Sequence, residues 1–131
     1  MPHQATAGAV LYAKDVERMS RFYAQCCGLE VAHSGVDHVV LESPTFQLVI
    51  HSIPPSIAAS IAIAAPPARR TDTPIKLYFH VEGIDAARES AARLGGALDP
   101  PGREWRLRAD KVCDGIDPEG NVVQFRERMS R

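Results

Sequence analysis

The sequence lacks the features that would assign it at once to several large classes of protein. Its 15 Lys and Arg residues nearly balance 16 Asp and Glu residues, and a net charge of -1 argues against the broad basic surface of a nucleic-acid-binding protein. The longest apolar stretch without charge, residues 52–68, contains four prolines and few large apolar side chains, so no transmembrane helix is predicted. Residues 1–9 lack the basic and apolar regions of a secretory signal, and we therefore expect a cytoplasmic protein.

Cysteine is also scarce. The three cysteines, Cys26, Cys27 and Cys113, are odd in number and form no CxxC pair, so they predict neither a disulfide framework nor a cysteine-bound zinc ion. The apolar content of 45% is ordinary for a soluble protein, and 131 residues suffice for one folded domain with its own core.

Two segments share one pattern at an offset of 68 residues, which indicates an internal duplication. In each segment a strand precedes an amphipathic helix that ends at glycine. The first has a strand at 9–13 and a helix that starts after Asp15 and ends at Gly28. The second has a strand at 77–81 and a helix that ends at Gly95-Gly96, so that Gly96 aligns with Gly28.

Further strands are predicted after each helix, so each half follows a βαβββ order. The predicted strands lie at 29–33, 36–42 and 46–53 in the first half, and around Ala97, at 106–116 and at 122–128 in the second. We expect an α+β fold in which residues 1–131 form one domain. Its modules are predicted at 5–53 and 75–129, joined by a Pro- and Ala-rich linker at 54–74 with a short helix or strand around 57–65.

Three motifs occur in a characteristic order. They are the helix end from Arg21-Phe22-Tyr23 to Gly28-Leu29, the strand Leu77-Tyr78-Phe79-His80-Val81, and the turn Asp117-Pro118-Glu119-Gly120-Asn121 before the last strand. With these motifs the sequence resembles the vicinal oxygen chelate superfamily, which includes glyoxalase I, the bleomycin resistance proteins and the extradiol dioxygenases. The resemblance implies two βαβββ modules curled into a cupped mixed sheet, a homodimer, and a ligand site inside each cup.

The resemblance also implies where a metal would bind. In metal-dependent members, four cup-facing positions carry His, Glu, His and Glu, and here they align with Gly8, His51, Lys76 and Gln124. Glycine has no ligating atom, a neutral amide is a poor ligand for Zn²⁺, Ni²⁺ or Fe²⁺, and an ammonium repels a divalent ion. We therefore expect no cofactor at this site, without excluding a divalent metal elsewhere.

Because strand side chains alternate between faces, residues opposite to the apolar core should line the cup. These candidate ligand-binding residues are Tyr12, Gln47, Tyr78, His80, Gln124 and Arg126, with Lys76 near a strand start. Trp105 follows the turn Pro100-Pro101-Gly102, where the resemblance implies a loop over the pocket. A lining of aromatic, amide and cationic groups favours a small polar-aromatic or anionic molecule.

Three functional hypotheses follow. The first is metal-independent binding of such a molecule, as in bleomycin resistance proteins. The second is an enzyme: a divergent lactoylglutathione lyase or dioxygenase with a displaced metal site recruiting His38, Glu42, His51 or His80, or a metal-free isomerase with His51 or His80 as general base. In this second case His51 is the candidate catalytic residue. The third is a regulatory domain whose only activity is dimerisation.

Overall fold

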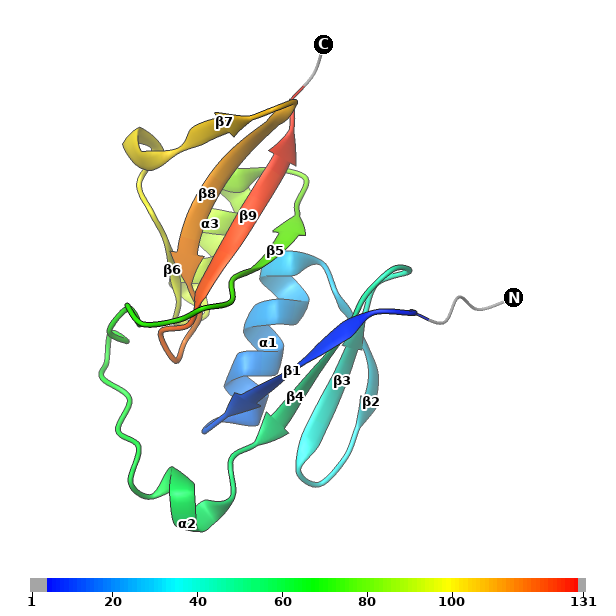
Figure 1. The fold of residues 1–131 in the computed structure, drawn as a ribbon, viewed down its shortest axis with the longest axis vertical. Helices are drawn as coiled ribbons and strands as arrows, with labels where there is room; N and C mark the ends of the chain where they lie inside the picture. Colours follow the sequence, from blue (N-terminus) through cyan, green and yellow to red (C-terminus); the bar gives the residue numbers. More distant parts are fainter. Residues whose placement is uncertain (1–4, 130–131) are drawn as a thin grey trace. The chain divides into compact units, whose positions relative to one another are not determined.

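The computed structural model describes residues 5–129, and its elements follow the predicted order (Figure 1). The first half contains β1 (Gly8–Ala13), α1 (Val16–Cys27), β2 (Glu30–Ser34), β3 (His38–Glu42), β4 (Gln47–Ser52) and the short α2 (Pro55–Ala58). The second half contains β5 (Leu77–His80), α3 (Ile84–Arg93), β6 (Ala97–Leu98), a 3-10 turn (Pro101–Arg103), β7 (Trp105–Leu107), β8 (Asp110–Ile116) and β9 (Val122–Arg128).

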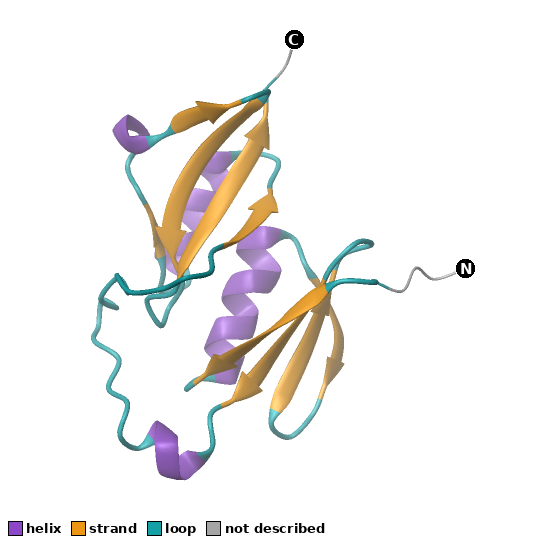
Figure 2. Ribbon diagram, viewed as in Figure 1, coloured by secondary structure: helices purple, strands orange, loops and turns teal. Residues whose placement is uncertain are grey.

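The chain divides into two compact units, Met1–Ala62 and Ile63–Arg131, and the division falls inside the predicted linker 54–74. Each unit has its own mixed sheet (Figure 2). The first sheet has the order β1-β4-β3-β2, and the second has the order β5-β9-β8-β6 with β7 paired to β8. In the first sheet β1 pairs in parallel with β4, and in the second β5 pairs in parallel with β9. The remaining pairs are antiparallel. The predicted α+β class is confirmed.

Helix α1 begins and ends where the sequence predicts. The Asp15 side chain accepts a hydrogen bond of 3.0 Å from the Arg18 backbone N–H, which satisfies one of the unpaired donors of the first turn. Gly28 adopts the left-handed conformation (φ 68°) that ends many helices. Met19 and Phe22 lie on the buried stripe of this helix, which packs against β3 and β4.

Helix α3 is capped from another element. Gly83 precedes it and offers no side chain, but the Glu127 carboxylate on β9 accepts a hydrogen bond of 2.8 Å from the Ile84 N–H. A carboxylate at this position also complements the positive end of the helix dipole. Ile84, Ala87 and Ala91 bury the helix against its sheet.

Two predicted elements differ from the structure. The single strand predicted at 106–116 is a hairpin of β7 and β8, because Arg108 takes a positive φ of 57° and reverses the chain. The second module therefore has one strand more than the βαβββ pattern. In the linker, the predicted helix or strand around 57–65 is only the four-residue α2, since residues 61–65 form no regular element.

The predicted turn at 117–121 is present and well supported. Asp117 is buried, and one of its carboxylate oxygens accepts hydrogen bonds from the N–H groups of Glu119 (2.9 Å) and Asn121 (3.0 Å). Gly120 has a positive φ of 86°, and its carbonyl accepts a hydrogen bond of 2.9 Å from the N–H of Arg70. The turn therefore fixes the end of the linker against β9.

The predicted alternation of faces is confirmed. On the helix-facing side of the strands, Leu48, Ile50, Phe79, Val123 and Phe125 are buried. On the opposite side, Val10, Tyr12 and Tyr78 are each more than half exposed. The candidate ligand-binding residues of the strands therefore share the sheet faces that the helices leave open, although Gln124 itself is only 8% exposed.

Candidate functional site

A continuous row of polar side chains crosses the open face of the second sheet. Tyr78, Gln124 and Asp114 are cross-strand neighbours on β5, β9 and β8, so their side chains share one face. Asp114 accepts a hydrogen bond of 2.8 Å from Lys76 Nζ on one oxygen and one of 3.2 Å from Gln124 Nε2 on the other. The Gln124 carbonyl oxygen in turn accepts a hydrogen bond of 2.8 Å from Arg126 Nε. We call Lys76, Asp114, Gln124 and Arg126 the polar row.

Arg126, at one end of the polar row, packs its guanidinium on the ring of Tyr78. Its guanidinium carbon lies 3.6 Å from the centroid of the Tyr78 ring, within the range of a cation–π contact. His80 meets the same tyrosine edge to face, with ring centroids 6.1 Å apart, and its Nε2 lies 3.8 Å from an Asp110 carboxylate oxygen. Five of the predicted site residues therefore lie together on this face: Lys76, Tyr78, His80, Gln124 and Arg126.

Trp105 lies on β7 at the outer side of the same sheet. It pairs with Val112, which pairs with Arg126, so the three belong to one cross-strand line. Its side chain is 40% exposed. The tryptophan thus adds an accessible aromatic surface two strands from Arg126.

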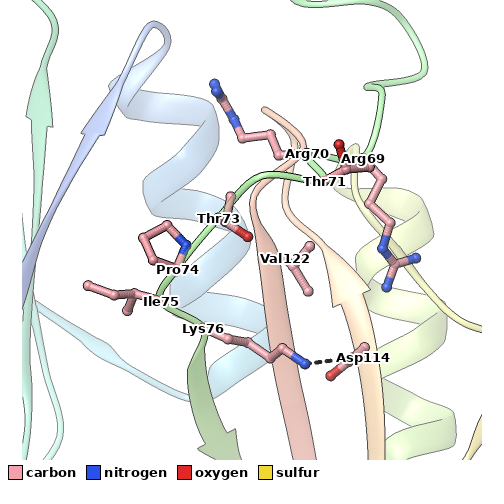
Figure 3. Close-up of a pocket in the computed structure, with 9 residues that line it drawn as sticks. All are labelled: Arg69, Arg70, Thr71, Thr73, Pro74, Ile75, Lys76, Asp114 and Val122. Carbon is pink, nitrogen blue, oxygen red and sulfur yellow. Dashed lines mark hydrogen bonds and ion pairs between the residues drawn. The ribbon is translucent and has the colours of Figure 1, made fainter.

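A groove of about 430 Å³ lies between the end of the linker and the starts of these strands (Figure 3). Its lining residues are Arg69, Arg70, Thr71, Thr73, Pro74, Ile75, Lys76, Asp114 and Val122. Lys76 and Asp114 point toward one another in it. Arg69 forms a two-point ion pair with Asp99 (2.8 and 3.2 Å), and this hydrogen bonding raises the pKa of Arg69. The groove is polar, and at least two of its cations have acidic partners.

The other face of the second sheet holds a cluster centred on Arg88 of α3. Its guanidinium donates to Asp85 (2.8 Å), to the Asp99 carbonyl (3.0 Å) and to Glu104. Burial opposes the charge of Arg88, but its bonds to Glu104 and Cys113 leave its pKa above the usual value. Burial raises the pKa of the Cys113 thiol, so this cysteine stays protonated and does not resemble an activated nucleophile.

One end of the open face of the first sheet carries a group of histidines beside Asp37. His38 and His51 are cross-strand neighbours with nearly parallel rings 6.0 Å apart, and the ring of His33 lies 5.4 Å from that of His38. The hydrogen bond from His38 Nδ1 to Asp37 (2.8 Å) is the main cause that lowers the pKa of this exposed carboxyl group. His51 donates from Nδ1 to the Ser52 carbonyl (2.9 Å), which leaves Nε2 3.6 Å from Asp37.

The two other candidates in the first unit are separated along the sheet. Tyr12 on β1 lies beside the end of β4, and Gln47 lies at its start. Tyr12 is the cross-strand neighbour of His51, with ring centroids 5.8 Å apart. Gln47 lies at the start of β4, where its amide donates a hydrogen bond of 2.8 Å to Glu42. Gln47 is thus separated from the histidine group by the length of the strand.

The comparisons with known proteins agree with this architecture. The family model for the glyoxalase-like domain matches residues 8–125. The chain belongs to this family. The resemblance to the vicinal oxygen chelate superfamily is therefore confirmed, whereas no protein of curated function matches the chain in sequence.

Solved structures of the family share this fold. A glyoxalase/bleomycin resistance protein/dioxygenase family enzyme from Burkholderia phytofirmans PsJN superposes with a TM-score of 0.70 at 16% identity, over 96% of this chain and 100% of that one. A glyoxalase/bleomycin resistance protein from Albidiferax ferrireducens T118 gives a TM-score of 0.64 at 19% identity, with coverages of 93% and 97%. A transposon-encoded bleomycin resistance determinant gives 0.59 at 10% identity, with coverages of 95% and 98%. At these identities the similarity concerns the fold.

Strand register corrects one alignment with the family pattern. In the second unit Gln124 pairs with Tyr78, which corresponds to Val10 at the offset of 68 residues, and Val10 pairs with Val49. The first-unit counterpart of Gln124 is therefore Val49. His51 pairs with Tyr12 and is the counterpart of Arg126. The implied ligand positions of this glyoxalase-like chain are thus Gly8, Val49, Lys76 and Gln124. His51, the one good metal ligand of the predicted four, is not among them.

These four residues do not fit the metal of the family. Neither Gly8 nor Val49 has a ligating side chain, Lys76 carries an ammonium, and the Gln124 amide already bonds to both Asp114 and Arg126. Across residues 5–129, no group of three or more His, Cys, Asp or Glu is arranged to hold a metal ion. Over the same residues, no helix is long and apolar enough to cross a membrane.

The sequence did not predict the acids that bind the polar side chains on the open face of each sheet. Asp114 joins Lys76 to Gln124, but it lies within the stretch predicted as one long strand, and nothing in that stretch marked it. Asp37 and His33 were missed beside His38, although the adjacency of Asp37 and His38 in a turn was a usable signal. The missing information was which strands pair, because these contacts cross between strands.

Proposed function

We propose that this glyoxalase-like protein binds a small polar-aromatic or anionic molecule on the open face of β5, β9 and β8, without a metal. The observation that carries the proposal is the polar row: the positions at which the family pattern puts metal ligands hold an ammonium and an amide that are already bonded to one another through Asp114. The fold is that of the family, whereas the residues at these positions support a different chemistry.

The electrostatics of the polar row disfavour a divalent ion. The Lys76 ammonium has no lone pair to offer a metal, and it pairs with the Asp114 carboxylate at 2.8 Å. Both oxygens of Asp114 accept hydrogen bonds within the row. A metal would have to break these contacts before it gained a ligand.

The same face suits an organic ligand. Tyr78 is 51% exposed, and Trp105 offers a second accessible ring. Aromatic side chains provide large apolar contact area while their polar atoms remain free to form hydrogen bonds. Ligand sites in proteins generally combine apolar surfaces with a few fixed polar groups that orient the ligand, and this face offers both.

Metal content and ligand binding test this proposal together. The full chain is expressed with Zn²⁺, Ni²⁺, Fe²⁺ and Mn²⁺ available, and its metal content is measured by inductively coupled plasma mass spectrometry. Aromatic and anionic compounds are then screened by thermal shift with and without EDTA. We expect far less than one metal per chain, and ligand-induced shifts that EDTA does not change.

Stoichiometric metal together with EDTA-sensitive binding would contradict the proposal. It would favour the alternative of a divergent lyase or dioxygenase with a displaced site, for which the pairing of His51 Nε2 with Asp37 at 3.6 Å in the first unit is the relevant observation. Methylglyoxal with glutathione would then be the first assay. The homodimer and the cytoplasmic location stay predictions of the sequence.

A further inference from the structure

We propose that the ligand is an aromatic carboxylate, and that the guanidinium of Arg126 binds its carboxylate group. This inference rests on the proposed function, because it names the ligand class for the same face of the second sheet. It depends on three features of Arg126: its unmatched charge, its fixed orientation and its aromatic surroundings.

Arg126 carries a positive charge that no acid of the polar row pairs with, and a further acid on this face, Asp110, contacts His80. Lys76 pairs with Asp114 at 2.8 Å, and Arg69 at the rim of the groove pairs with Asp99 at 2.8 Å. Among residues 5–129, no Asp or Glu forms an ion pair with Arg126, and the one hydrogen bond of its side chain is to the neutral amide of Gln124. The polar row therefore has a surplus charge of one sign at its Arg126 end, which suits a monoanion.

The guanidinium is held in place before any ligand arrives. Its Nε donates to Gln124, and its plane is supported by the Tyr78 ring at 3.6 Å. Gln124 is itself held, since its amide nitrogen donates to Asp114 at 3.2 Å. Because fewer rotatable bonds must be fixed on binding, a group ordered in this way loses less entropy than a free surface arginine.

The hydrogen-bonding groups that remain match a carboxylate. With Nε occupied, the two terminal nitrogens of Arg126 offer the free N–H donors. A guanidinium presents such donors in a planar fork, which two carboxylate oxygens accept in parallel. Lysine offers no comparable fork, so the specificity should depend on arginine and not on charge alone.

Aromatic surfaces flank this anchor. Tyr78 lies directly under the guanidinium and is half exposed, while Trp105 lies two strand spacings away, roughly 10 Å. A carboxylate held by Arg126 brings an attached ring into this aromatic region. An aliphatic acid would satisfy Arg126 but would gain little from these rings.

The test compares aromatic carboxylates with their neutral amides on the full chain, in EDTA. Benzoate and benzamide, and cinnamate and cinnamamide, are titrated while the fluorescence of Trp105, the single tryptophan, is recorded. We expect each carboxylate to bind at least about 10-fold more tightly than its amide. Arg126→Gln should weaken carboxylate binding by about 10- to 100-fold and leave amide binding unchanged, because a charge-assisted hydrogen bond is lost.

Two further variants make the experiment specific. Arg128→Gln removes a guanidinium two residues further along β9 on the same face, where the side chain is exposed, and it should not change affinity. Arg126→Lys keeps the charge but should not restore wild-type affinity. Unchanged amide binding by Arg126→Gln shows that the variant is folded.

The outcomes separate this inference from the proposed function. If carboxylates and amides bind equally, or if Arg126→Gln binds carboxylates as the wild type does, the inference is wrong while small-molecule binding stands. If phenyl phosphate binds more tightly than either carboxylate, the assigned class is wrong. If neither the aromatic carboxylates nor the neutral amides bind, both the inference and the proposed function fail.

Discussion

Gly120 occupies a position in the 117–121 turn that has no room for a side chain. A Cβ atom there would lie 2.1 Å from the Ala68 carbonyl oxygen, and the φ of 86° is one that residues with a side chain rarely adopt. The close approach exists because the Gly120 carbonyl accepts the Arg70 N–H. The turn therefore depends on this glycine for both its conformation and its contact with the linker.

Gly120→Ala should destabilise the protein by at least about 1–2 kcal/mol from the backbone conformation alone, with a further cost from the close contact. The free energy of unfolding is measured by urea denaturation. Gly102→Ala is the matched control, because nothing lies within 4 Å of its Cβ position, and it should change stability by less than about 0.5 kcal/mol. Equal effects of the two substitutions would show that the turn tolerates a side chain at Gly120.

At the scale of elements, Arg88 connects α3 to the segment that leads into β7. Its side chain is 20% exposed and that of its partner Glu104 is 11% exposed, so water screens the pair only weakly. Glu104 has a second cationic neighbour, Lys111, at 3.5 Å. Removal of Arg88 would leave a mostly buried carboxylate with one longer ion pair.

Arg88→Met should therefore cost about 2–3 kcal/mol in the free energy of unfolding, somewhat less than for a fully buried pair. The double variant Arg88→Met/Glu104→Met should recover part of this loss, because it removes the unpaired charge. Arg93→Met, on the exposed face of the same helix, is the control and should have little effect. A single variant as stable as the control would show that the cluster around Arg88 does not hold β7 in place.

Elements with local signals were predictable from the sequence, and elements without them were not. The helix α1 is defined by Asp15 at one end and Gly28 at the other, and both act as predicted. The break between β7 and β8 has no such signal, because Arg108 adopts a positive φ without being Gly, Asn or Asp. A turn of this kind becomes visible only when the two strands are seen to pair.

The candidate site was predictable in part for a related reason. Alternation along a strand identifies which face a residue lies on, and the exposed positions of Tyr12 and Tyr78 agree with it. A shift of two residues, however, keeps every side chain on its own face. The alternation could therefore not distinguish Val49 from His51 as the counterpart of Gln124, and the pairing of the strands decides it.

At the scale of the whole molecule, the two compact units meet along the chain between Ala62 and Ile63. Residues 62–65 around this point are mostly exposed and form no regular element. The backbone N–H of Arg70, further along the linker, donates a hydrogen bond to the Gly120 carbonyl, so the linker is attached to the second unit before β5 begins.

Limited digestion with elastase should therefore cut first within residues 62–65, because exposed irregular segments with small apolar residues suit this protease. Mass spectrometry should find two early fragments, each close to half of the chain. A first cut in the β7–β8 turn or in the strands would contradict the division into these two units.

The contacts of Gln124 also bear on what it would take to build a metal site at these positions. Metal-dependent relatives are expected to carry an acid at this position, and Gln124→Glu restores one with a single substitution. The new carboxylate would face Asp114, which the Gln124 amide now approaches to 3.2 Å, and two adjacent carboxylates cannot both stay charged without a cost. Lys76 would then lie near two acids. A glutamate introduced at position 124 alone would therefore disturb the polar row without completing a metal site. A metal site at these positions would therefore require changes at Lys76, Asp114 and Gln124 together.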